Sequence, residues 1–235
     1  MKKKNQLLIF PLIVMGMFLM LTNSCEKDEK KDDDPAPNIT VTDIDGNVYN
    51  TVIIGTQVWM LENLKVTKFN DGTAIPLVTD SSAWTNLSTP GFCWYDNDEA
   101  TYKNTYGALY NWFTVNTGKL SPAGWHVPTD ADWTILTSYL GGESVAGGKL
   151  KEAGTTHWKS PNTGATNESG FTGLPGGMRN VPGFFYNIKD SGIWWSSTEY
   201  DATDGLLSRA DYNYGGFYKH NLVKTCGFSI RCVKD

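Results

Sequence analysis

Cysteine and histidine are scarce in this sequence of 235 residues, which contains four Cys and three His. No two cysteines form a CxxC pair, and His126, His157 and His220 are far apart in the sequence. Structural zinc sites need closely spaced ligands of this kind, so we predict no zinc site. A basic excess is also missing, since 25 Asp and Glu outnumber 20 Lys and Arg. Without a positively charged stripe, nucleic acid is not an expected partner.

The motifs of two large enzyme classes are incomplete. Gly148-Lys149 could end a phosphate-binding loop, but Glu143 stands where that loop needs its first glycine. Ser144 could be a hydrolase nucleophile, but Ala146 replaces the glycine that closes the turn around it. We therefore predict a protein that is not an enzyme and that holds no organic cofactor.

The N-terminus has the pattern of a bacterial lipoprotein signal. Three lysines at positions 2–4 precede an apolar run over residues 7–21, which is too short and interrupted to span a bilayer comfortably. Cys25 follows at the cleavage site, although Thr22 stands where the usual pattern has Leu. We predict a signal peptide over residues 1–24 and lipidation of Cys25. Ordinary cleavage beside an unrelated cysteine is the alternative.

Residues 25–37 are predicted to be a disordered acidic tether. The run EKDEKKDDD over residues 26–34 has no apolar side chain and cannot be buried. Acidic residues directly after a lipidated cysteine resemble the surface-export signals of Bacteroidetes lipoproteins. The resemblance implies an outer-membrane protein that faces the cell exterior and has the membrane as a partner through its lipid. A plain solvated spacer on a periplasm-facing anchor is the alternative.

Residues 38–235 have a suitable length for one globular domain. At its start, ITVTDI and NVYNTVII flank Asp45-Gly46, which is a strong hairpin turn signal. We predict a β-meander over residues 38–69. A calcium loop is the alternative for this turn, but Gly46 comes too early for one.

Two helices are predicted. Apolar residues at helical spacing predict the first over residues 106–115. Thr129 and Asp132 nearly match a capping box at the start of the second, and Gly141-Gly142 ends it. Beyond this helix the sequence predicts a long loop over residues 141–192. Three strands follow, over residues 193–200, 206–213 and 227–233.

Six segments from Tyr106 onward carry a resemblance to a known family. They are YGALYNW, PAGWHVPTDADWTIL, GGKLKEAGTTHW, SPNTGATNESGFTGLPGG, WWSSTEY and GFSIRCVKD. In this order they resemble the Fibrobacter succinogenes major paralogous domain, which would cover residues 38–235. GWHVPTDADW and GFSIRCV are also similar to the formylglycine-generating-enzyme superfamily. This implies an α+β, C-type-lectin-like domain with two helices, small twisted antiparallel sheets, paired N- and C-terminal strands and a long loop region.

The resemblance bears on the cysteines. Formylglycine-generating enzymes use two nearby thiols before the final strand, and Cys226 is near that place, but residues 217–225 contain no second thiol. We therefore expect no oxidase activity. Cys93 and Cys232 fall in strongly patterned segments, which implies a disulfide between them. Closing so long a loop would contribute roughly 4–5 kcal/mol before strain is deducted. Cys226–Cys232 is the rival pair.

The acidic segment WYDNDE contains the calcium candidates Asp96, Asn97 and Asp98. Carboxylate and amide oxygens at this density suit calcium, and a solvated loop is the alternative. The calcium and sugar motifs of true C-type lectins are absent from the sequence.

The ligand is expected at the loop region 155–190. The resemblance places binding surfaces in such loops, and this one combines aromatic and polar side chains. Trp158, Arg179 and Tyr186 are the first candidates, and Trp195 in the next strand is a fourth. The alternative is a compact loop with Phe171 in the core.

Together these features predict a lipid-anchored envelope protein with a non-catalytic recognition or adhesion domain. Its ligand would be a glycan or a surface protein. The alternatives are a structural or accessory subunit of an envelope assembly and, third, an oxidase of the formylglycine-generating type.

Overall fold

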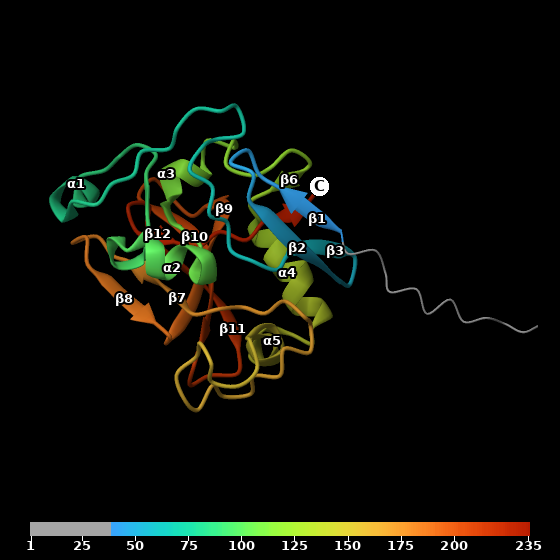
Figure 1. Cartoon of the computed structure of the whole chain (residues 1–235). Helices are drawn as coiled ribbons and strands as arrows, with labels where there is room; N and C mark the ends of the chain where they lie inside the picture. Colours follow the sequence, from blue (N-terminus) through green and yellow to red (C-terminus); the bar gives the residue numbers. More distant parts are fainter. Residues whose placement is uncertain (1–38) are drawn as a thin grey trace, which may run out of the picture. The chain divides into compact units, whose positions relative to one another are not determined.

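The computed structural model describes residues 39–235, so the predicted signal peptide, Cys25 and the acidic tether lie outside the described residues. Within this range, three antiparallel sheets and five α-helices form a mixed α+β fold (Figure 1). None of these helices is long and apolar enough to cross a membrane. The α+β class is the one that the sequence predicts.

The first sheet brings together strands from both ends of the described region. Its strands lie in the order β1–β2–β3–β13–β6, with the bounds Thr40–Thr42, Val48–Ile54, Gln57–Met60, Val233–Lys234 and Trp125–His126. Val233 pairs with Trp59 on one side and with His126 on the other. The predicted β-meander is present. The C-terminal strand β13 joins the same sheet but pairs with β3 and β6 rather than with the N-terminal strand β1.

Asp43 holds the turn between β1 and β2. Its Oδ1 accepts hydrogen bonds from the backbone N–H groups of Asp45 (3.0 Å) and Asn47 (2.9 Å). Its Oδ2 accepts one from the Tyr49 hydroxyl at 2.6 Å. The carboxylate oxygens are thus engaged inside the turn, as expected of an Asx-type hairpin turn. This confirms the hairpin prediction at Asp45-Gly46.

Five α-helices connect the sheets. They are α1 (Ser81–Thr85), α2 (Glu99–Tyr106), α3 (Trp112–Val115), α4 (Asp130–Tyr139) and α5 (Glu143–Leu150). Helix α4 confirms the second predicted helix. Thr129 Oγ1 accepts from the Asp132 N–H, and the Asp132 carboxylate accepts from the Thr129 N–H at 2.8 Å. This complete capping box satisfies two N–H groups that a helix start otherwise leaves unpaired.

The predicted helix over residues 106–115 is mostly wrong, because its middle residues, Leu109–Asn111, form a strand of the third sheet. That sheet has the order β4–β5–β12–β7–β8, with the bounds Phe92–Cys93, Leu109–Asn111, Gly227–Phe228, Gly176–Arg179 and Phe185–Ile188. Leu109 pairs with Cys93, and Tyr110 pairs with Phe228. Helix α3 begins only after Asn111, whose Oδ1 accepts from the Thr114 N–H at 3.0 Å. Pairing with strands from other parts of the chain outweighed the local preference for a helix that the spacing of apolar residues indicated.

Helix α5 lies inside the stretch that the sequence predicts to be a loop. The glycine-rich composition of the segment favoured a loop in the prediction. In the structure, Gly147 and Gly148 are buried in the helix. A Cβ at Gly147 would lie 1.9 Å from the carbonyl oxygen of Gly216. Gly148 donates its N–H to the carbonyl of Gly215 at 2.7 Å. The glycines therefore allow the helix to touch a neighbouring backbone.

Gly147→Ala is expected to lower the free energy of unfolding by about 2–3 kcal/mol, because the added methyl overlaps a backbone carbonyl that cannot rotate away. Thermal and urea unfolding measure the loss. In an exposed helix, the same change would stabilise the protein by roughly 1 kcal/mol. Ser144→Ala, at an exposed position of the same helix, is the matched control and should be nearly neutral. Equal stability of Gly147→Ala and wild type would contradict the close approach.

The second sheet separates two hydrophobic cores. Its order is β11–β10–β9, with the bounds Phe217–Val223, Asp204–Asp211 and Ser191–Glu199. Adjacent residues of a strand point to opposite faces. On one face, Trp194 packs with Phe217 and with Trp133 of α4, in a core that also contains residues of α5. Trp195 packs against Phe228 on the other face, with ring centroids 4.5 Å apart. Both tryptophans are buried because both faces of the sheet are covered.

Candidate recognition surface

Arg179 does not face solvent, so its prediction as a ligand contact is wrong. The side chain is fully buried at the end of β7. Its Nε donates to the carbonyl of Gly183 at 3.0 Å, and its two terminal nitrogens donate to the carbonyls of Val78 (2.6 Å) and Thr79 (2.8 Å). The fork of a guanidinium suits such a set of acceptors. Arg179 therefore ties the hairpin of β7 and β8 to the chain before α1.

Aromatic rings complete the environment of Arg179. Its guanidinium carbon lies 4.6 Å from the ring centroid of Trp84 and 5.0 Å from that of Phe185. Cation–π contacts of this kind are stronger when they are desolvated. Phe185 also contacts Tyr95, with centroids 5.3 Å apart. The inner face of the hairpin is therefore firmly packed.

Trp158 and Trp195 are also core residues, which corrects their prediction as ligand contacts. Trp158 is 1% exposed, and its Nε1 donates to the carbonyl of Gly173 at 2.9 Å. Trp195 Nε1 donates to the carbonyl of Tyr110, also at 2.9 Å. With its polar atom satisfied internally, an indole ring is well suited to a core. Neither ring can stack on a ligand without unfolding its surroundings.

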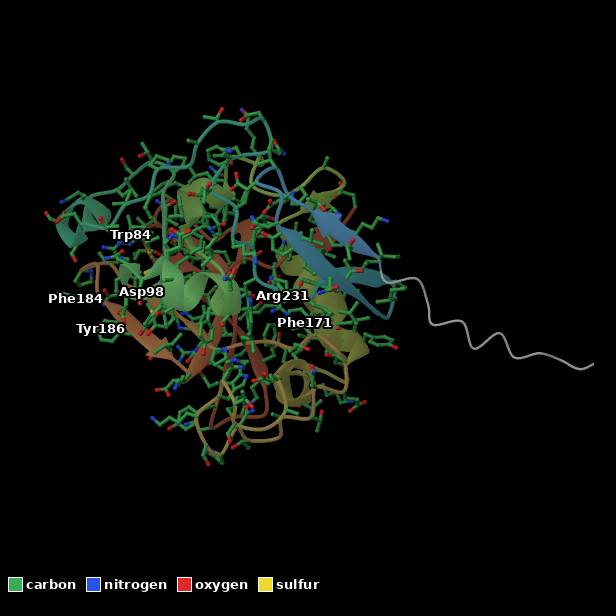
Figure 2. The ribbon with its side chains drawn as sticks, viewed as in Figure 1. Trp84, Asp98, Phe171, Phe184, Tyr186 and Arg231 are labelled. Carbon is green, nitrogen blue, oxygen red and sulfur yellow. The ribbon has the colours of Figure 1, made fainter. Side chains whose placement is uncertain are left out.

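Tyr186 is the candidate that remains accessible. It is 48% exposed, and Phe184, two residues before it, is 56% exposed. Phe184 directly precedes β8, and residues two apart in extended backbone share a face, so both rings lie opposite the half-buried Phe185. Figure 2 shows Phe184 and Tyr186 at the same edge of the domain. We call this pair the aromatic platform. The predicted loop region 155–190 includes Phe184 without singling it out.

The calcium candidates lie in the turn before α2. Asp98 caps that helix, since its Oδ1 accepts from the Thr101 N–H at 3.0 Å. Asn97 donates through Nδ2 to the carbonyl of Thr79 at 3.1 Å. Asp96 and Asn97 both have positive φ, at 51° and 57°. Over residues 39–235, no three His, Cys, Asp or Glu side chains gather as a metal site would require. The calcium prediction stays untested.

The three cysteines of the described region are free and buried, so the Cys93–Cys232 disulfide is not formed in this structure. Cys93 packs in a small cluster with Trp84, whereas Cys232 belongs to the first core and contacts Ser121 Oγ at 3.6 Å. The rival pair is not formed either. Burial raises the pKa of each thiol to about 12. None is therefore a thiolate at neutral pH, which the redox chemistry of a catalytic thiol needs.

The three histidines lie in separate places. His126 Nδ1 lies 2.7 Å from Asp235, and its Nε2 lies 3.2 Å from Asp132, so carboxylates occupy both ring nitrogens. His157 Nδ1 contacts Glu152 at 2.8 Å. These contacts hold the rings in place and leave His126 without a nitrogen for proton transfer to a substrate.

A family model settles the relationship of the chain. Residues 52–234 match the model of the Fibrobacter succinogenes major domain. The chain belongs to this family. The match includes the β7–β8 hairpin, all three strands of the second sheet and most of the first sheet. No curated protein and no solved structure matches the chain significantly.

Within this Fibrobacter succinogenes major domain, Arg231 joins the loop region to the final strands. It is fully buried and donates to the carbonyl of Phe171 and, over 3.1 Å, to Oδ1 of Asn63 (Figure 2). Its guanidinium carbon lies 4.1 Å from the ring centroid of Phe171. Burial lowers the pKa of Arg231 to about 9, so the side chain is still charged at neutral pH. Phe171 lies in the core, as the compact-loop alternative predicts.

A pocket that sequence reasoning missed opens on the second sheet of the family domain. Its volume is about 190 Å³, and it lies on the face that carries Trp195. It is lined by Ile193, Leu207, Arg209, His220 and Leu222. No pattern in the sequence indicates it, because the pocket depends on the register that places Leu207 opposite His220 and Arg209 opposite Ile193.

Proposed function

We propose that this protein is a lipid-anchored recognition module whose ligand binds at the aromatic platform. The observation that carries the proposal is the exposure of Phe184 and Tyr186 on a hairpin that Arg179 holds in place. Aromatic rings offer a large contact area at a small cost in side-chain entropy. A ligand that meets a preorganised pair of rings loses less free energy to ordering than one that meets a mobile loop. Sugar rings and apolar side chains of a partner protein both suit such a surface.

The proposal includes the setting of the domain. Cys25 carries the lipid, the acidic tether directs export, and the domain faces the exterior of the outer membrane. The domain has a C-type-lectin-like fold, in keeping with the pairing of β13 with β3. A non-catalytic role is supported by the buried thiols and by the two carboxylates that occupy His126.

Phe184→Ala combined with Tyr186→Ala is expected to weaken ligand binding by about tenfold or more, because central aromatic contacts dominate recognition surfaces. The ligand is sought on a glycan array, with and without calcium, and in parallel by binding to envelope proteins. The melting temperature should change little, since both side chains are exposed. Tyr200→Ala removes another exposed aromatic ring, 57% exposed, outside the hairpin and is the matched control.

The outcomes separate the alternatives. Binding to glycans that the double variant loses and the control retains supports a sugar-binding module. Binding to an envelope protein alone, with the same variant dependence, supports the accessory-subunit alternative. A ligand that binds wild type and double variant equally would show that the aromatic platform is not the site.

A further inference from the structure

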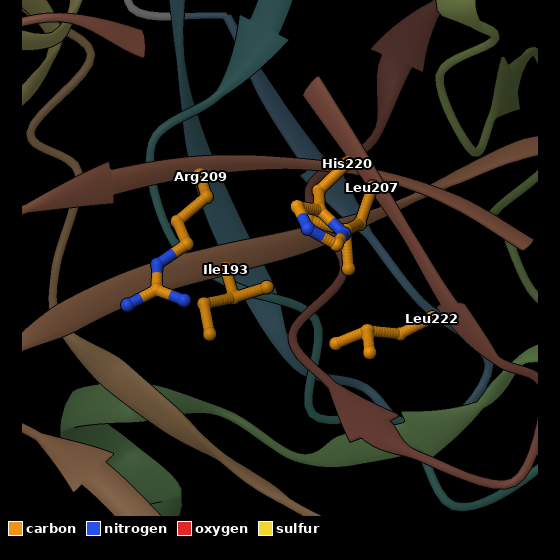
Figure 3. Close-up of a pocket in the computed structure, with 5 residues that line it drawn as sticks. All are labelled: Ile193, Leu207, Arg209, His220 and Leu222. Carbon is orange, nitrogen blue, oxygen red and sulfur yellow. The ribbon is translucent and has the colours of Figure 1, made fainter. Parts of the chain in front are cut away.

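The pocket on the second sheet has the size of a single ring. Apolar cavities of about 150 Å³ are known to hold benzene, and this pocket measures about 190 Å³. Figure 3 shows Ile193 between Arg209 on one side and Leu222 on the other, with His220 and Leu207 beside them. Three aliphatic side chains supply no hydrogen-bond partners for the several hydroxyl groups of a sugar. The lining therefore favours an apolar ring.

His220 gives the pocket one hydrogen-bond acceptor. Its Nδ1 lies 2.6 Å from the carbonyl oxygen of Asn221. A carbonyl only accepts, so Nδ1 carries the proton and Nε2 of the neutral ring is an acceptor. Within residues 39–235 no side chain or backbone group bonds to Nε2. A ring that bears one hydroxyl group could donate to it.

Arg209 gives the pocket a flat, oriented cation. Its Nε donates to Asp211 Oδ1 at 2.8 Å, and one terminal nitrogen donates to Ser191 Oγ at 3.0 Å. These bonds fix the plane of the guanidinium, whose face attracts the negative face of an aromatic ring. Asp211 also balances the charge, so an anionic ligand would meet a carboxylate beside the cation. A neutral aromatic ring therefore fits better than an acid.

We propose that this pocket binds a phenolic ring, with its body against Ile193, Leu207 and Leu222, its face toward Arg209 and its hydroxyl toward His220. The ring could belong to a free phenol or to a tyrosine side chain of a polypeptide. The site lies on other strands than the aromatic platform and does not depend on the function proposed above.

The test titrates the full-length ¹⁵N-labelled protein with phenol, toluene and cyclohexanol and follows the backbone amides of β9, β10 and β11. Phenol is expected to shift the amides around the pocket and to bind about threefold to tenfold more tightly than either other probe. Toluene lacks the hydrogen-bond donor, and cyclohexanol lacks the aromatic face. N-acetyl-tyrosinamide distinguishes the sources: binding as tight as that of phenol indicates a polypeptide tyrosine, and exclusion indicates a free phenol.

Three variants locate the site. His220→Phe, at an exposed position, keeps a ring but removes the acceptor, so it should abolish the advantage of phenol over toluene and leave toluene binding unchanged. Leu222→Trp should fill the pocket and prevent binding of all three probes. Tyr186→Ala should change nothing, which separates this site from the aromatic platform. Melting temperatures confirm that each variant is folded.

Three results would overturn the proposal. Phenol could shift amide signals outside β9, β10 and β11. Phenol, toluene and cyclohexanol could bind with equal affinity. Phenol could still bind to the Leu222→Trp variant. If the Leu222→Trp variant does not fold, the affinities of His220→Phe for phenol and toluene still test whether phenol binds in the pocket. If the aromatic platform turned out to bind no ligand, the result of these titrations would still stand, because they report on the pocket alone.

Discussion

Arg231→Ala is expected to lower the free energy of unfolding by about 3–5 kcal/mol. The change leaves a cavity beside Phe171 and removes the hydrogen bond to its carbonyl. Both the cavity and an unpaired buried acceptor are costly, and together they outweigh the relief of no longer burying a charge. Urea denaturation with an unchanged m-value measures the loss.

Two further substitutions separate the causes. Arg231→Met restores most of the volume but not the donors, so we expect an intermediate loss of about 1–3 kcal/mol. Arg209→Met removes a half-exposed arginine of the second sheet and controls for the loss of charge, with an expected cost of about 1 kcal/mol or less. Equal stability of Arg231→Ala and Arg209→Met would show that Arg231 does not hold the loop region.

Cys25→Ala is expected to move the protein from the membrane fraction to the soluble fraction. A single acyl chain binds a bilayer only marginally, whereas the several chains of a bacterial lipoprotein hold it stably. Without the thiol, no chain can be attached. Fractionation of cells grown with labelled palmitate measures both the lipid and the location.

Thr22→Leu is the control for this experiment, because it brings the signal closer to the usual lipoprotein pattern and keeps Cys25. It should retain the label and the membrane location. Protease added to intact cells then reports the orientation: cleavage of the wild-type domain indicates that it faces the exterior. Membrane association of Cys25→Ala together with an unlabelled wild type would show that Cys25 is not an anchor.

Two local signals in the sequence, the turn at Asp45-Gly46 and the start of α4, predicted local structure correctly. The turn at Asp45-Gly46 is closed by Asp43, which is two residues before Asp45. Its side chain accepts from the Asp45 N–H, and its backbone carbonyl accepts from the Gly46 N–H. The start of α4 depends on Thr129 and Asp132, which bond to each other. Such features need no knowledge of distant residues, so their residue types were enough to find them.

The accessible surface could not be predicted in the same way. Arg179 resembled a ligand contact because a charged residue in a glycine-rich segment is usually solvated. Two of its three acceptors are the backbone carbonyls of Val78 and Thr79, about a hundred residues away. Every residue has a carbonyl, so the sequence does not show which ones will accept. Trp158 was misplaced for the same reason, since its partner is the carbonyl of Gly173. Only Tyr186 among the four candidates faces solvent.

The position of β13 between β3 and β6 bears on when the protein can fold. Trp59 finds its partner in Val233, so the first sheet stays open until nearly the whole domain has been synthesised. Contacts between residues so far apart form late and slowly. A chain that remains unfolded until its C-terminal part appears can be threaded through a secretion channel before it closes. If the domain is exported and lipid-anchored as we propose, this strand order would keep the chain unfolded until it has crossed the membrane.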